Sequence, residues 1–210
     1  MLDAALIEKC ADPSLTPAIV EHFVAVAGSD DPLAITVKSG GQLVLVPKPQ
    51  SPEEALDIMR QYVGKAIVRI GITQYPAGVG IVDIGQLDAG LVDPCGNLKR
   101  GTALFAKVAR IVTKWYGNPT SKEVMPQMFE DAVHAWRTGE FEGTKVFQSD
   151  DPGGATFLRG KPLPPEPKDD EPTEREAVTP IEDDHLPTTD ENKAGSAEMR
   201  IDLSRIGGQR

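Results

Sequence analysis

The stretch FVAVAGSDDPLAI, residues 23–35, predicts the end of a helix followed by a turn. Upstream of it, Thr16 is a typical N-cap residue and Pro17 suits the first helical turn. Apolar residues recur from there at helical spacing as far as Ala27, and Gly28 is a typical helix stop. The sequence therefore predicts a main helix that ends beside an aspartate-rich turn.

The remainder of residues 1–160 predicts a mostly helical α+β domain with one small β-hairpin. The run ITVKSGGQLVLV predicts the hairpin, because its central glycines can supply the positive φ of a tight turn. Residues 66–81 combine β-favouring residues with glycines and a proline, which predicts a short extended piece followed by a loop. Periodicity, caps and glycine stops predict four further helices, over residues 2–10, 52–62, 93–115 and 121–138. In the last two helices, Trp115 and Trp136 are expected in the core.

Residues 161–210 have the composition of a disordered tail. They contain no aromatic residue, 7 of the 18 prolines, and 13 Asp or Glu against 7 Lys or Arg. Near the end, Met199, Leu203 and Ile206 would lie on one face of a helix. We therefore expect an acidic, proline-rich tail with a short docking helix at residues 196–206 for a partner.

The charge balance argues against several classes of function. The net charge is −10, and the tail supplies 7 minus 13, or −6, which leaves −4 for residues 1–160. A domain without a basic field is not expected to bind nucleic acid directly. No apolar run is long enough to predict a transmembrane helix. The three histidines have no metal-ligand spacing and no nucleotide-binding or serine-hydrolase motif is found, so neither metal nor cofactor is expected.

The first residues and the cysteines leave the compartment open. The start, MLDAALIEKCADPSLTP, lacks the basic cluster and apolar run of a secretory signal as written. Cys10 and Cys95 are compatible with one disulfide in an oxidising compartment, or with two buried thiols in a reducing one.

Four motifs together resemble a known family: CADPSLTPAIVEHFVAVAGSDDPLAI, GITQ, LVDPCGNL and AWRTGEF. They occur in the order found in VirB-type secretion-system lytic transglycosylases, enzymes with a lysozyme-like α+β domain that cleave peptidoglycan. The whole chain is still more similar to the conjugal transfer proteins of rhizobial plasmids. The resemblance covers residues 1–160 and implies a lysozyme-like fold, a periplasmic location, partners in the conjugation apparatus, contact with peptidoglycan, and a disulfide between Cys10 and Cys95.

The same resemblance exposes a missing catalytic acid. In the enzymes a glutamate ends the first main helix, and it donates a proton to the glycosidic oxygen. Aligning DPLAI without a gap places Ala27 at that position, and a shift of one residue places Gly28 there. Glu21 lies on nearly the opposite helix face. Asp30 and Asp31 follow the helix and are the alternative proton donors, although aspartates are also ordinary turn residues.

The groove residues of the family are also altered. The resemblance implies that Gly71, Gln74 and Tyr75 line a sugar groove together with Trp136 and Thr138. The family usually has other residues after the glutamine, and Trp136 replaces a tyrosine that supports the catalytic carboxyl. An indole donates one hydrogen bond but accepts none, so the polar chemistry of the site changes. A core position for Trp136 and a structural role for the glycine and glutamine are the alternatives.

Three functions remain open from the sequence. The first is a noncatalytic, lysozyme-like accessory module of plasmid conjugation by type IV secretion, and it follows from the absent glutamate. The second is an active peptidoglycan lytic transglycosylase that uses Asp30 or Asp31. The third is a cytoplasmic interaction protein that retains only the fold.

Overall fold

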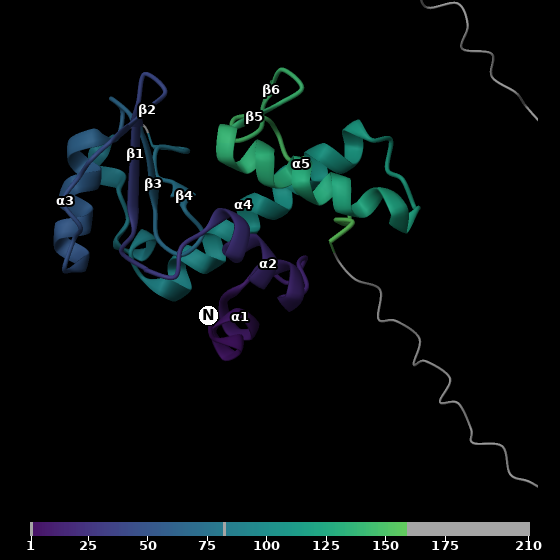
Figure 1. Ribbon diagram of the computed structural model, residues 1–210, viewed down its shortest axis with the longest axis horizontal. Coiled ribbons are helices and arrows are strands. Elements are labelled where there is room, and N and C mark those ends of the chain that lie inside the picture. Colours follow the sequence, from purple (N-terminus) through teal and green to yellow (C-terminus); the bar gives the residue numbers. More distant parts are fainter. Residues whose placement is uncertain (1, 82, 159–210) are drawn as a thin grey trace, which may run out of the picture. The chain divides into compact units, whose positions relative to one another are not determined.

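The computed structural model describes residues 2–81 and 83–158 (Figure 1). The main helices are α1 (Ala4–Cys10), α2 (Pro17–Ala27), α3 (Pro52–Tyr62), α4 (Pro94–Trp115) and α5 (Met125–Thr138). The strands are β1 (Ile35–Ser39), β2 (Gln42–Val44), β3 (Ile67–Ile70), β4 (Tyr75–Pro76), β5 (Glu140–Phe141) and β6 (Thr144–Lys145). Short 3-10 turns are η1 (Ile84–Gln86), η2 (Ala89–Leu91) and η3 (Lys122–Val124). The predicted mostly helical α+β architecture is confirmed, whereas the predicted tail and its docking helix lie outside the described residues.

A four-stranded antiparallel sheet forms one part of the domain, in the order β2-β1-β3-β4. The predicted hairpin between β1 and β2 is confirmed, and Gly40 and Gly41 make its turn with φ of 57° and 82°. Figure 1 shows α3 beside this sheet. Buried Met59 of α3 packs with Val37 and Val68 of the central strands, so this face of the sheet is closed by the helix.

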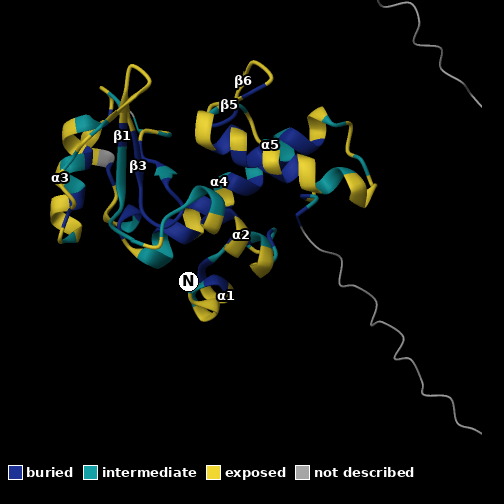
Figure 2. Ribbon diagram, viewed as in Figure 1, coloured by how far each residue is buried: buried dark blue, intermediate teal, exposed yellow. Residues whose placement is uncertain are grey.

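A second core surrounds α4, which runs through the middle of the helical part. Figure 2 shows buried residues concentrated along α4 and β3. Phe23 of α2 stacks on Phe105 of α4 with ring centroids 4.0 Å apart, and Trp136 of α5 meets Phe23 edge-on at 5.2 Å. All three side chains are fully buried. This aromatic cluster joins three helices that are distant in the sequence.

The structure corrects two expectations of local detail. Trp115 was expected in the core, but it is 56% exposed. It lies in the last turn of α4, where it borders a surface cavity that Asp131 and His134 of α5 also line, and its ring meets Tyr116 and Phe141 edge-on at 5.0 Å and 5.4 Å. The loop expected after β3 turns back at once and adds β4, because Pro76 pairs with Arg69 in the sheet.

Candidate functional site

The carboxyl end of α2, where the resemblance implies a catalytic glutamate, is tied to the loop after β3. Ala27 is half-buried and packs on the helical core. The next residues approach the loop so closely that Ser29 N donates to the carbonyl of Ile72 at 2.8 Å. A Cβ on Gly28 would lie 2.2 Å from the Ile72 oxygen. Gly28 is therefore required by close backbone contact and not by a left-handed conformation, since its φ is −102°.

Gln74, expected to line a sugar groove, uses its amide inside the protein. Its Oε1 accepts from Thr36 Oγ1 at 2.7 Å, and its Nε2 donates to the carbonyls of Ala34 and Gly71 at 3.2 Å and 3.1 Å. Gln74 itself has a φ of 51°, an uncommon value for a residue other than glycine. The amide therefore joins β1 to the loop, and binding a sugar with it would require breaking these bonds.

Trp136 and Tyr75, the aromatic residues expected at the groove, differ in their surroundings. Trp136 is fully buried, and its Nε1 donates to the carbonyl of Thr73 at 3.2 Å. Its ring meets Phe147 edge-on at 5.6 Å. Tyr75 is half-buried between the two cores, and burial raises the pKa of its hydroxyl. The structure thus places Trp136 in the core, where no ligand can reach it without rearrangement.

Asn97, the asparagine of the DPCGNL motif, fixes the same loop to α4. Its Oδ1 accepts from Thr73 N at 2.9 Å and from Thr73 Oγ1 at 2.8 Å, and its Nδ2 donates to the carbonyls of Ile70 and Leu91, both at 2.9 Å. All four hydrogen-bonding positions of the amide are used, in a side chain that is 1% exposed. A Cβ on Gly71 would lie 2.4 Å from Asn97 Nδ2, so the loop can come this close to Asn97 only with a glycine at position 71.

Two arginines cap helix ends at the boundary between the sheet and the helices. Arg69 of β3 donates to the carbonyls of Gln74 at 3.0 Å, Trp136 at 2.5 Å and Arg137 at 3.1 Å. Burial lowers the pKa of the Arg69 guanidinium to about 10, so it remains a cation at neutral pH. Arg137 in turn donates to the carbonyl of Val26 in the last turn of α2. Cations are favourable at the carboxyl ends of helices, where the backbone dipole is negative.

The two aspartates after α2, the alternative proton donors, lie in different surroundings. Asp31 forms an ion pair with Lys48 at 2.9 Å. The hydrogen bonds from Lys48 and from the backbone N–H of Leu33 keep the pKa of the Asp31 carboxyl below its ordinary value. Asp30 lines a cavity of about 520 Å³ at the carboxyl end of α2, together with Glu21 and Gly28. Asp31 is therefore ionised at neutral pH and carries no proton to donate.

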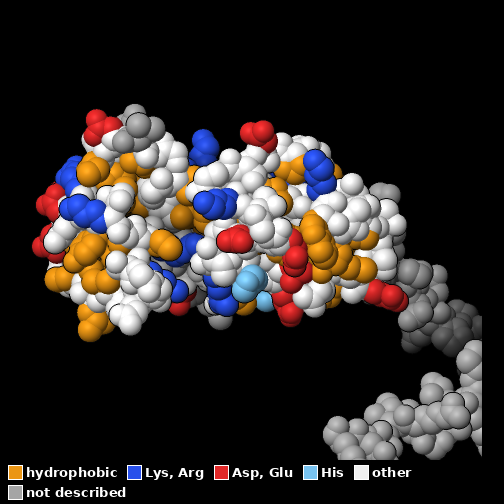
Figure 3. All heavy atoms as spheres, turned by 90° about the horizontal axis from the view of Figure 1, so that it is seen from above, with side chains coloured by type: hydrophobic (Ala, Val, Ile, Leu, Met, Phe, Trp, Pro, Cys, Tyr) orange, Lys and Arg blue, Asp and Glu red, His pale blue; other side chains and the backbone are white. Residues whose placement is uncertain are grey.

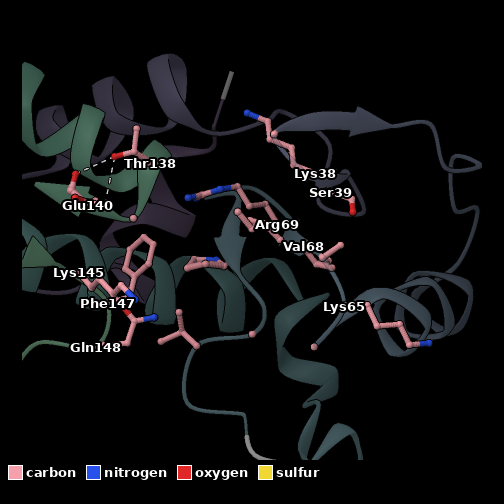
Figure 4. A pocket seen from close by; sticks show the side chains of 18 of the residues that line it. Lys38, Ser39, Lys65, Val68, Arg69, Thr138, Glu140, Lys145, Phe147 and Gln148 are labelled. Carbon is pink, nitrogen blue, oxygen red and sulfur yellow. Dashed lines mark hydrogen bonds between the residues drawn. The ribbon is translucent and has the colours of Figure 1, made fainter. Parts of the chain in front are cut away.

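A groove of about 620 Å³ opens between the sheet and the end of α5, and we call it the basic groove (Figure 4). Its sheet side includes Lys38, Lys65 and Arg69, and its other side includes Lys145 and Phe147. Figure 4 shows Arg69 reaching from β3 toward α5 across this space. Of the five residues expected in a sugar groove, Thr138 lines the basic groove, whereas Gly71, Gln74, Tyr75 and Trp136 do not.

Cys10 and Cys95 are joined by a disulfide that links the end of α1 to the first turn of α4. Among residues 2–81 and 83–158, no group of His, Cys, Asp and Glu side chains is arranged to hold a metal ion. Within the same described part of the chain, none of the helices has the length and apolarity that crossing a membrane requires.

Asn97 and Arg69 are the residues whose roles the sequence analysis missed. An asparagine inside the first turns of a helix, next to apolar Leu98, is a sequence signal for a buried polar contact, because asparagine is a weak helix former. Arg69, between Val68 and Ile70, is a similar signal, since it interrupts a β-favouring run. Neither signal identifies the partners, which lie on other elements.

Comparisons with known proteins identify the family of the chain. The family model TraH_2 matches residues 1–208. A protein of Sinorhizobium fredii (strain NBRC 101917 / NGR234), described as uncharacterized protein y4dP, is 57% identical over 208 residues, which cover 99% of this chain and 100% of that protein. No solved structure matches. The family match supports the expected relation to plasmid conjugation and leaves the resemblance to lytic transglycosylases as an expectation. The chain belongs to the TraH_2 family, a family related to conjugal transfer.

Proposed function

We propose that the protein is a noncatalytic, lysozyme-like accessory module of the plasmid conjugation apparatus. One observation supports this proposal: the position at the carboxyl end of α2 that the resemblance gives to the catalytic acid has no carboxyl group. Ala27 stands where the resemblance implies the catalytic glutamate, and the neighbouring carbonyl of Val26 accepts a hydrogen bond from Arg137. Cleavage of a glycosidic bond needs an acid that is protonated when it meets the leaving oxygen, and a cation at this helix end disfavours such a carboxyl.

The alternative of an active transglycosylase has less support. The ion pair with Lys48 lowers the pKa of the Asp31 carboxyl, and Asp30 lines a cavity that Gln74 and Trp136 do not line. No carboxylate of the described residues bonds to Gln74 or Trp136, the side chains that the resemblance places nearest the chemistry. A general acid must come within about 3 Å of the oxygen that it protonates.

The disulfide supports a periplasmic location for this module. Disulfides persist in oxidising compartments such as the bacterial periplasm and are rare where thiols are kept reduced. A cytoplasmic interaction protein, the other alternative, would be expected to hold Cys10 and Cys95 as thiols. Fractionation of tagged protein with thiol labelling in intact cells checks the location: labelling of both cysteines before reduction would favour the cytoplasm.

The catalytic part of the proposal is tested by incubating the purified full-length protein with peptidoglycan sacculi. We expect no release of anhydro-muropeptides above the level without protein, while an active muramidase serves as the positive control. Release by the unmodified protein would show that the proposal is wrong, because another group must then supply the proton.

Two variants test the role of residue 27 in the same assay. Ala27→Glu alone is expected to remain inactive, because Arg137 would favour the ionised form of the new carboxyl. The double variant Ala27→Glu/Arg137→Asn removes that cation and places the asparagine of the family motif at position 137. Activity of the double variant alone would identify the lost glutamate and the arginine as the cause of inactivity. Arg137→Asn alone is the matched control.

A further inference from the structure

The basic groove has the opposite charge to the chain that carries it. The whole chain has a net charge of −10, yet the groove is lined by Lys38, Lys65, Arg69 and Lys145 against a single acid, Glu140. None of the three lysines forms an ion pair with a carboxylate of the described residues. In the space-filling view, Lys and Arg side chains are spread over the face shown, with Asp and Glu side chains among them (Figure 3). This local positive field points to an anionic ligand.

Buried Arg69 adds to the positive field of the basic groove. Its side chain is 8% exposed and is fixed by three backbone carbonyls and by the rings of Trp136 and Phe147, whose centroids lie 5.8 Å and 5.9 Å from its guanidinium carbon. No carboxylate of the described residues neutralises it. A charge held at the base of a groove in a low-dielectric wall acts on a ligand more strongly than an exposed charge does.

The sheet side of the groove also presents exposed aliphatic surface. Lys38 lies opposite Ile67 on β3 and opposite Leu43 on β2, so the three side chains form a row across the sheet face that is not covered by α3. Ile67 is 57% exposed and Leu43 is 61% exposed. Ile67 lines the groove next to Lys38, and Leu43 lies beside it, so the lysine is flanked by aliphatic surface.

We propose that the basic groove binds an extended acidic polypeptide segment of a partner protein. In an extended strand, alternate side chains point to the same side, so acidic residues at every second position can all face the lysines. Nucleic acid fits less well, since sequence-tolerant binding of single strands uses exposed aromatic platforms, and the one aromatic side chain lining the groove, Phe147, is 9% exposed. The inference deepens the proposed function by giving the ligand class of the module.

The test measures binding to purified full-length protein by fluorescence anisotropy at low salt. The probe is a labelled peptide of alternating Glu and Val, and its neutral counterpart carries Gln in place of Glu. We expect binding of the acidic peptide that weakens as salt is added, and no comparable binding of the neutral one. The double variant Lys38→Gln/Lys145→Gln should bind the acidic peptide roughly tenfold more weakly.

The control variant is Lys99→Gln/Lys122→Gln, which removes the same charge from exposed positions outside the groove and should bind like the unmodified protein. Thermal melts of both variants show whether folding is retained. Equal weakening by both variants, or no binding of the acidic peptide, would overturn the proposal. Tighter binding of oligothymidine that depends on Lys38 and Lys145 would overturn it in favour of nucleic acid. The assay is independent of muropeptide release, so either proposal can fail while the other stands.

Discussion

Replacing Asn97 by leucine should lower the free energy of unfolding by about 4 kcal/mol, although the two side chains are similar in size. The change leaves the backbone N–H of Thr73 and the carbonyls of Ile70 and Leu91 without their partner, in a place closed to water. Each buried polar group left unpaired costs roughly 1–3 kcal/mol. Chemical denaturation followed by circular dichroism measures the difference.

The matched control for this prediction is Lys99→Leu, two residues further along α4. Lys99 is exposed, so the same new side chain should change the free energy of unfolding by less than about 0.5 kcal/mol. If Asn97→Leu unfolds at the same denaturant concentration as Lys99→Leu, the four hydrogen bonds of Asn97 do not hold the loop to α4. The loop after β3 links the core around α4 to the core between the sheet and α3. Loss of Asn97 is therefore also expected to make the two cores unfold less cooperatively.

Reducing the disulfide between Cys10 and Cys95 should cost about 4 kcal/mol of stability. The bond closes a loop with a sequence separation of 85, and a cross-link over such a length restricts the unfolded chain strongly in the chain-entropy model. Paired denaturation curves with and without reductant measure the effect. The lower stability should appear as a shift of the midpoint toward lower denaturant.

The double variant Cys10→Ser/Cys95→Ser separates the covalent bond from other effects of reductant. It should be as unstable as the reduced protein and should not respond to reductant at all. A response of this variant would mean that the reductant acts elsewhere, and an unchanged midpoint in the unmodified protein would contradict the stabilising role of the bond.

Most elements of the fold could be predicted from local patterns. The first residues of α3 and α4 follow from their N-caps: Ser51 Oγ accepts from Glu54 N at 3.2 Å, and Asp93 accepts from Gly96 N at 2.7 Å. The β1–β2 turn follows from its two glycines. Such signals are reliable because they depend on residues only a few positions apart, whose geometry the backbone fixes.

The candidate site could be predicted only in part. The absence of an acid at Ala27 is visible in the sequence, because it concerns the identity of one residue. The inward-facing amide of Gln74 was not predictable from the motif. Its hydrogen bonds join it to Thr36 in β1 and to Ala34 just before that strand, far from Gln74 in the sequence. A short motif fixes which side chain is present, but its direction depends on what surrounds it.

Local sequence is thus sufficient for helices, turns and the vacant acid position, because these depend on neighbours along the chain. Only the tertiary structure shows that Trp115 at the end of α4 is exposed, since periodicity does not show which side chains the neighbouring elements cover. It was also needed for the basic groove, whose Lys38 and Lys145 are more than a hundred positions apart. Their charges act together only because Arg69 bonds the sheet to the end of α5, a contact between groups that no local pattern relates.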